Sequence, residues 1–140
     1  MDLLPGIRGG HWSGRSELWL DVGGNEAIEG GCELSVDSNQ LSYSWSRGDK
    51  HHEGRFTLGD DGSVYWSDSF HQAEPVRCVQ EERWSLLSLY YTYPAGEGPD
   101  WGWRLAFSQR PDSSLVLQMT NIAPWGEEQR AVRMIFSELG

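Results

Sequence analysis

Asp68, in the stretch "SVYWSDS", is the residue whose chemistry most needs a structural explanation. Val64, Trp66 and Asp68 alternate with their neighbours, so they share one face of a strand. If that face points inward, the carboxylate of Asp68 is buried, which is costly unless a partner satisfies it. Arg104 and Arg133 are the natural partners. Two interpretations stay open: a polar anchor at the bottom of an aromatic pocket, or a salt bridge that ties strands together.

The segment "WGWRLAF" raises a related question, because it places two tryptophans beside an arginine. On a strand, Trp101 and Trp103 project to one face and Arg104 projects to the other. Leu105 and Phe107 share the face of the tryptophans. The sequence therefore predicts that the tryptophans point inward and that Arg104 lies at the rim or outside. With eight tryptophans in 140 residues, it also predicts a lined cavity or an aromatic-rich core.

A cluster of possible metal ligands occurs in "DKHHEG", where His51, His52 and Glu53 are adjacent, and His71 follows later. Adjacent residues on a strand point to opposite faces, so at most two of the three local groups converge. We therefore expect no metal site and no cofactor.

No nucleophile and base stand in a recognisable arrangement, and none of the many serines lies in a Gly-x-Ser-x-Gly elbow. An aromatic barrel with inward polar groups could still transfer a proton on an apolar substrate. In that case Asp68 would act as the base and Tyr91 or His52 as the acid. A cofactor-free isomerase or cyclase is thus an alternative function, although the catalytic residues stay unassigned.

The elements that position these residues are strands. Turn signals recur about every eight to twelve residues, and the segments between them alternate with a period of two. In "LSYSWSR", for example, Leu41, Tyr43 and Trp45 face one way and three serines face the other. Residues 86–93 form a strand after a turn, because aromatic residues crowd the stretch before Pro94. The pattern predicts about ten antiparallel strands and no long helix.

About ten short strands in one chain must either stack as a sandwich or close on themselves. Closure removes both exposed edges, and inward residues of mixed polarity favour a cavity over a dry sandwich core. We therefore expect an all-β protein with one domain, residues 1–140. Its fold would be a single antiparallel up-and-down barrel of about ten strands with a central cavity.

The formal net charge of −10 and the single lysine, Lys50, argue against nucleic-acid binding. No segment approaches the ~20 apolar residues of a membrane span, and the N-terminus does not resemble a signal peptide. Cys32 and Cys78 match no metal or redox spacing and are expected to be buried thiols. These features predict a cytoplasmic protein with no nucleic-acid or membrane partner. They do not indicate an oligomeric state.

Four motifs resemble those of a known superfamily. Gly10-His11-Trp12 in "GGHWSGRSELWL" is similar to the Gly-x-Trp opening strand of the calycins, which include lipocalins and fatty-acid-binding proteins. "VYWSDS", "WGWRLAF" and "NIAPWGEEQRAV" resemble, in the same order, a bacterial lipocalin-like family of unassigned function. The resemblance extends from Gly9 to Glu138. It implies a calycin-like barrel with Trp12 at its narrow end.

The chain also departs from two better-known groups of that superfamily. The Arg-x-Tyr pair with which fatty-acid-binding proteins grip a carboxylate is absent, since no tyrosine follows Arg130 and Arg133. Haem-binding barrels of the nitrobindin type use a histidine near the C-terminus, and this chain has none after His71.

We expect the protein to bind a small, largely apolar molecule inside the barrel. The alternatives are the enzyme described above and a structural or interaction domain with a filled interior. The expected ligand-binding residues are Tyr43, Trp45, His52, Phe56, Trp66, Asp68, Tyr91, Trp103, Met119, Asn121 and Arg133.

Overall fold

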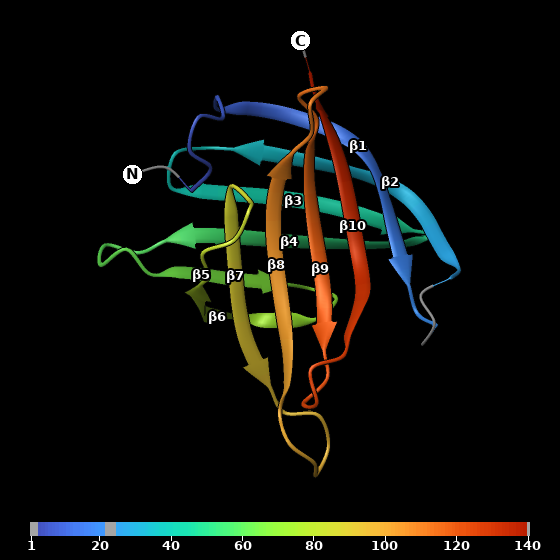
Figure 1. Ribbon diagram of the computed structural model, residues 1–140. Coiled ribbons are helices and arrows are strands. Elements are labelled where there is room, and N and C mark those ends of the chain that lie inside the picture. Colours follow the sequence, from blue (N-terminus) through green and yellow to red (C-terminus); the bar gives the residue numbers. More distant parts are fainter. Residues whose placement is uncertain (1–2, 22–24, 140) are drawn as a thin grey trace.

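The computed structural model describes residues 3–21 and 25–139, which form a closed barrel of ten antiparallel strands (Figure 1). The strands are β1 (Gly10–Trp19), β2 (Ala27–Val36), β3 (Gln40–Arg47), β4 (Lys50–Leu58), β5 (Val64–Asp68), β6 (Gln72–Gln80), β7 (Leu87–Tyr93), β8 (Trp101–Gln109), β9 (Leu115–Ile122) and β10 (Glu128–Glu138). Each strand pairs with its neighbours in sequence, and β1 also pairs with β10. The predicted up-and-down barrel is confirmed. Within these described ranges no helix is long and apolar enough to cross a membrane.

Side-chain burial follows the predicted two-residue alternation. In β3 the exposed fraction of Leu41, Tyr43 and Trp45 is at most 4%, whereas the serines between them are partly exposed. In β8 the side chains of Trp103, Leu105 and Phe107 are buried in the same way, as expected. This alternation divides each strand into an inner and an outer set of residues.

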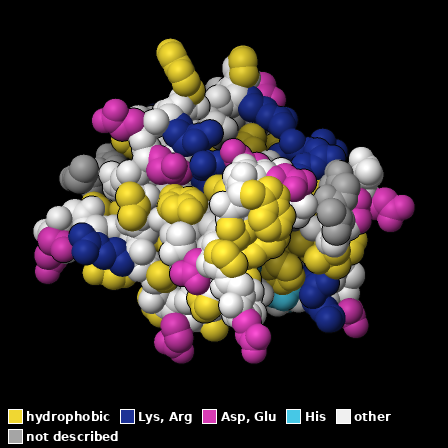
Figure 2. Space-filling view, turned by 60° about the horizontal axis from the view of Figure 1, so that its bottom comes forward, with side chains coloured by type: hydrophobic (Ala, Val, Ile, Leu, Met, Phe, Trp, Pro, Cys, Tyr) yellow, Lys and Arg dark blue, Asp and Glu magenta, His cyan; other side chains and the backbone are white. Residues whose placement is uncertain are grey.

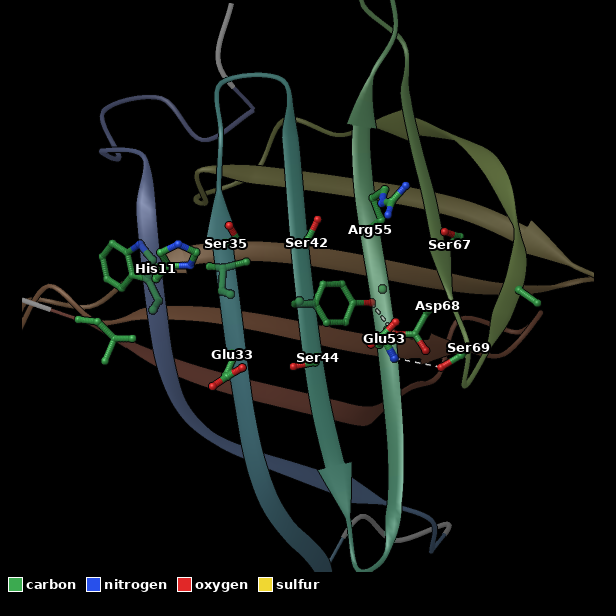
Figure 3. A pocket seen from close by; sticks show the side chains of 16 residues that line it. His11, Glu33, Ser35, Ser42, Ser44, Glu53, Arg55, Ser67, Asp68 and Ser69 are labelled. Carbon is green, nitrogen blue, oxygen red and sulfur yellow. Dashed lines mark hydrogen bonds between the residues drawn. The ribbon is translucent and has the colours of Figure 1, made fainter.

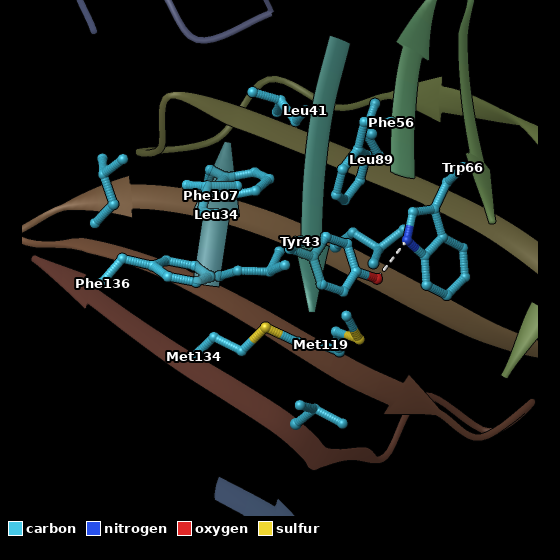
Figure 4. Packing of buried hydrophobic residues seen from close by; sticks show 14 of the residues in the cluster. Leu34, Leu41, Tyr43, Phe56, Trp66, Leu89, Phe107, Met119, Met134 and Phe136 are labelled. Carbon is cyan, nitrogen blue, oxygen red and sulfur yellow. Dashed lines mark hydrogen bonds between the residues drawn. The ribbon is translucent and has the colours of Figure 1, made fainter. Parts of the chain in front are cut away.

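Large side chains fill the centre of the barrel. Figure 1 shows β7–β10 crossing β2–β6 steeply, so the barrel is flattened into two facing layers. Phe56 of one layer packs edge-on against Phe107 of the other, with ring centroids 5.3 Å apart. Figure 4 shows this packing, in which the labelled residues are Leu34, Leu41, Tyr43, Phe56, Trp66, Leu89, Phe107, Met119, Met134 and Phe136. Burial of these apolar groups is the main stabilising contribution to the fold.

The two ends of the barrel differ. The N-terminal segment covers one end, where the backbone N–H of Leu3 donates to the carbonyl of Ser38 at 3.0 Å. Leu3, Leu4 and Trp12 are almost fully buried, and Trp12 lies near the start of β1 at this end. The opposite end carries the connections 69–71, 94–100 and 123–127. The described part of the N-terminal segment does not cover that end.

The barrel wall is weakest between β6 and β7. In the described strands only two residue pairs join them, Val79 with Tyr90 and Gln80 with Leu89. Residues 72–78 of β6 therefore have no ladder partner in β7, whereas every residue of β7 pairs with β8. A seam with so few backbone hydrogen bonds opens at lower cost than the rest of the wall.

Cys32 and Cys78 are both buried free thiols, as predicted. Burial raises the pKa of each thiol to about 12, so neither is a reactive thiolate at neutral pH.

A glycine on β4 allows residues of β3 and β5 to make contact across it. Tyr43 pairs with Gly54, and Gly54 pairs with Asp68 on the next strand. The ring of Tyr43 occupies the space above Gly54 where a side chain would lie, and its hydroxyl group donates to Asp68 Oδ2 at 2.5 Å. A residue without Cβ is what allows the ring to span the intervening strand.

Gly54→Ala should therefore destabilise the protein, because the added Cβ would collide with the ring of Tyr43 and displace it from Asp68. We expect the free energy of unfolding to fall by roughly 1–3 kcal/mol, as for other overpacked sites, measured by urea unfolding. The control is Gly98→Ala, where no atom lies within 4 Å of the added Cβ. Equal losses in the two variants would contradict this role of Gly54.

Candidate functional site

All the expected ligand-binding residues except Arg133 lie on the inner face of the barrel. They are Tyr43, Trp45, His52, Phe56, Trp66, Asp68, Tyr91, Trp103, Met119 and Asn121. Arg133 lies between the buried residues Val132 and Met134 and so points outward. Its Nε donates to Glu17 at 3.1 Å.

The salt bridge between Asp68 and an arginine, one of the two interpretations that the sequence left open, is not formed. Arg133 is held by Glu17, and Arg104 contacts Glu81 at 3.0 Å and Glu128 at 2.6 Å on the outer face. Alternation is the reason, because both arginines neighbour residues that must point inward. The prediction that Arg104 turns away from the tryptophans is confirmed by these contacts.

Neutral donors satisfy Asp68 instead. Its Oδ2 accepts from the hydroxyl of Tyr43 at 2.5 Å and from Nε1 of Trp45 at 3.4 Å. Its Oδ1 accepts from the backbone N–H of Phe70 at 2.6 Å. Burial raises the pKa of Asp68 above its ordinary value, and these hydrogen bonds oppose the rise. Both oxygens are occupied, so Asp68 organises the interior of the barrel.

Sequence reasoning considered His71 only as a metal ligand and missed its actual contact. His71 lies in the connection 69–71, and its Nδ1 is 2.6 Å from the hydroxyl oxygen of Tyr91. Burial lowers the pKa of His71 to about 4 and raises the pKa of Tyr91 well above its ordinary value. Both groups are therefore neutral at physiological pH. A turn residue that bonds twenty positions away leaves no periodic signal in the sequence.

His71 also covers Trp103. The imidazole stacks on the indole with ring centroids 3.7 Å apart and an interplanar angle of 14°. Tyr93 contacts the same imidazole edge-on at 4.7 Å, and its hydroxyl donates to Asn121 Oδ1 at 2.5 Å. We call His71, Tyr91, Tyr93, Trp103 and Asn121 the aromatic end.

One buried polar group at the aromatic end has no partner. The side chain of Trp103 is 3% exposed, and its Nε1 donates no hydrogen bond to any described residue. An unsatisfied buried N–H costs about 1–3 kcal/mol. A bound molecule with an acceptor oxygen or nitrogen would remove that cost.

Trp66 connects the aromatic end with Asp68. Its ring lies 5.7 Å from that of Tyr91 and is stacked 6.4 Å from that of Trp103. Its Nε1 donates to the hydroxyl oxygen of Tyr43 at 2.9 Å. Aromatic rings thus continue from the Asp68 cluster to the aromatic end.

The surface around this end is also aromatic. Trp125 in the connection 123–127 is 71% exposed and packs edge-on against Trp101, with ring centroids 5.6 Å apart. Figure 2 turns this side toward the viewer and shows hydrophobic side chains gathered on it, with acidic side chains projecting around them. An apolar surface next to a buried aromatic cluster is typical of a ligand site.

Two surface hollows are described, and neither coincides with the aromatic end. The larger, of about 610 Å³, is lined mainly by outward residues of β1–β5. The smaller, of about 480 Å³, lies around the connection 81–86. At the aromatic end the stacked imidazole of His71 occupies the space over Trp103, so a ligand there must displace it.

The possible metal ligands do not converge. His52 packs inward against Trp45 with ring centroids 4.6 Å apart, whereas His51 lies near Glu53 at 3.8 Å on the exposed side. Among the residues the structure describes, no three His, Cys, Asp or Glu side chains are grouped as metal ligands.

Asp68→Asn should destabilise the protein, because Tyr43, Trp45 and Phe70 lose part of their shared acceptor. We expect a loss of roughly 1–3 kcal/mol. Folding raises the pKa of Asp68 above the unfolded value of about 4. The contribution of Asp68 to the free energy of unfolding is therefore complete below a pH of about 4, and it is lost as pH rises through the pKa of the folded state. The difference between parent and variant should therefore shrink toward neutral pH. Urea unfolding at several pH values measures it, and exposed Asp60→Asn is the control.

His71 should impose the opposite pH dependence. Folding lowers its pKa from an unfolded value of about 6.5 to about 4. The stability that this shift contributes is complete above the unfolded pKa and is lost as pH falls between these values. His71→Gln should abolish that loss, whereas His51→Gln, on the exposed side, should retain it. Unfolding free energies measured across this pH range would contradict the assignment if both variants behaved like the parent.

Comparison with protein-family models gives no match, and no curated protein is similar to the chain. The closed ten-stranded antiparallel barrel is compatible with the calycin-like fold that the four motifs suggest. The functional conclusion therefore depends on the geometry of the barrel and its side chains.

Proposed function

We propose that this protein is a cytoplasmic, calycin-like binding module that holds a small, uncharged and largely apolar molecule at the aromatic end. The observation that carries this proposal is the buried Nε1 of Trp103, which has no acceptor among the described residues. An acceptor atom on the ligand would complete that hydrogen bond, and the surrounding rings would bury its apolar part.

The electrostatics of the aromatic end favour an uncharged ligand. Burial lowers the pKa of His71 and raises those of Tyr91 and Tyr93, so all three are neutral at physiological pH. A charged ligand would lose its hydration here without gaining a charged partner. The hydroxyl and amide groups of the site can instead orient a molecule by neutral hydrogen bonds.

The strand pairing of the barrel near His71 supports a route by which a ligand could reach Trp103. His71 belongs to a short connection rather than to a strand, and it stacks on Trp103. The adjacent seam between β6 and β7 is paired at only two positions. Movement of His71 and its connection away from β7 would expose the indole of Trp103 and would break the hydrogen bond between His71 and Tyr91.

The arrangement favours binding over proton transfer. Both oxygens of Asp68 already accept hydrogen bonds from the protein, which reduces their availability to take a proton from a substrate. Of the two candidate acids, His52 packs against Trp45 and Phe70, and the hydroxyl group of Tyr91 is engaged by Nδ1 of His71. The two buried thiols support the proposed cytoplasmic location, because a reducing compartment keeps thiols unpaired.

An uncharged acyl-aminonaphthalene fluorophore tests this proposal, because it has an apolar ring system and one carbonyl acceptor. We expect it to bind the parent protein with enhanced emission and to quench tryptophan fluorescence. Trp103→Phe replaces the indole by a smaller aromatic ring without an N–H, so it should weaken binding about tenfold. Trp84→Phe is the control, because Trp84 is fully exposed at 104% in the connection 81–86.

Unchanged affinity in Trp103→Phe, or loss of binding in Trp84→Phe, would place the fluorophore on the surface and contradict the proposal. Failure of the parent to bind the fluorophore, with no co-purified molecule in native mass spectrometry, would favour a filled structural barrel instead.

A further inference from the structure

The larger hollow lies on the outer side of β1–β5, where Ser69 of the connection 69–71 also lines it, and it has a volume of about 610 Å³. Figure 3 shows it with β7–β10 passing behind the strands that line it. Most of its lining side chains belong to the outer set of each strand. Ser42 and Ser44 of β3 are among its lining residues. Ser44 lies between Glu33 and Glu53 on the neighbouring strands, and Ser42 lies between Ser35 and Arg55.

Strand register arranges the outer side chains in two rows. The first row runs through successive residue pairs from β1 to β5 and consists of His11, Ser35, Ser42, Arg55 and Ser67. The second row lies two residues further along each strand and includes Glu33, Ser44 and Glu53. The labels in Figure 3 follow these two rows across the sheet.

The rows differ in the sign of their charge. Arg55 is the permanent cation of the first row, and it is a direct neighbour of Ser42. In the second row Glu33 and Glu53 are neighbours of Ser44 on either side. Two residues of a strand span roughly 7 Å, so a cationic position and an anionic position lie that far apart over β3.

These charges have few partners within the protein. Among the described residues Arg55 and Glu33 form no ion pair, and Glu53 has only His51 at 3.8 Å, with both side chains exposed. By contrast, Arg104 and Arg133 on the other half of the barrel are both engaged by glutamates. Short serines between the charged residues leave the space above β3 open.

We propose that this hollow is a second binding site, distinct from the aromatic end, for a small zwitterion whose ammonium and carboxylate groups are separated by a short alkyl chain. The carboxylate binds over Ser42, with Arg55 and Ser35 as neighbours. The ammonium group binds over Ser44, between Glu33 and Glu53. The spacing of the two rows selects a molecule that carries both charges over one that carries either charge alone.

Titration with γ-aminobutyrate, monitored by backbone amide shifts in NMR, tests the site on the intact protein. Butyrate and butylamine each retain one half of the zwitterion. We expect γ-aminobutyrate to saturate and to shift the amides of Ser42, Ser44 and Arg55, with each half binding at least about tenfold more weakly. Added salt should weaken binding, since the charges are near the surface.

Two variants separate the contribution of the cationic position to γ-aminobutyrate binding from that of the anionic position. Arg55→Gln should weaken γ-aminobutyrate about tenfold and abolish its preference over butylamine, whereas Glu33→Gln should remove most of its preference over butyrate. Arg83→Gln, which alters the smaller hollow, should leave the affinity unchanged. All three positions are exposed, and equal unfolding midpoints would confirm that each variant is folded.

Equal affinity for the three molecules, or unchanged binding in Arg55→Gln, would overturn this proposal. The acyl-aminonaphthalene fluorophore reports on the aromatic end separately, and its affinity should not change in Arg55→Gln. Competition between the fluorophore and γ-aminobutyrate would show that the two sites are not distinct and would also overturn it.

Discussion

Closure of the sheet between β1 and β10 is the constraint on which the rest of this structure depends. A closed sheet has an inside and an outside along its whole length, and successive residues of every strand are assigned to one or the other. Every inward polar group must therefore find its partner inside, where water and surface charges do not reach it. The distribution of hydrogen bonds, charges and hollows in this protein follows from that division.

Inside the barrel, neutral hydrogen-bond donors satisfy the buried carboxylate. Asp68 is satisfied by a tyrosine hydroxyl, an indole N–H and a backbone N–H, because alternation has placed the arginines on the outer wall. Gly54 makes this possible by leaving room for the ring of Tyr43. At the aromatic end Trp103 differs, since its buried N–H has no acceptor among the described residues, as is also the case for Trp12 at the other end of the barrel. The polar groups around Asp68 are thus satisfied within the protein, whereas Trp103 retains a donor that a ligand could satisfy.

The same strands present different chemistry on their two faces. β3 contributes Tyr43 and Trp45 to the interior and Ser42 and Ser44 to the outer hollow. Large inward side chains are needed to fill a barrel, but no such requirement acts on the outer face. Short serines outside therefore create space in which charged side chains of the flanking strands can meet a ligand. The two sites that we propose, one apolar and one polar, would in this way share strands of one barrel.

The sequence by itself determined the strands, their alternation and the inward orientation of Trp103, because turn residues and period-two patterns are local properties of the chain. Only the tertiary structure decided the partners. Asp68 bonds with Tyr43 from β3 because the register places Gly54 between them, and His71 meets Tyr91 because a hairpin connection folds toward β7. The charged rows of the outer hollow also arise from register across several strands. Register is the alignment of one strand with another that is distant in the sequence. Hydrophobic alternation shows which residues of a strand face the interior, but it does not show which side chains of the neighbouring strand will stand opposite them.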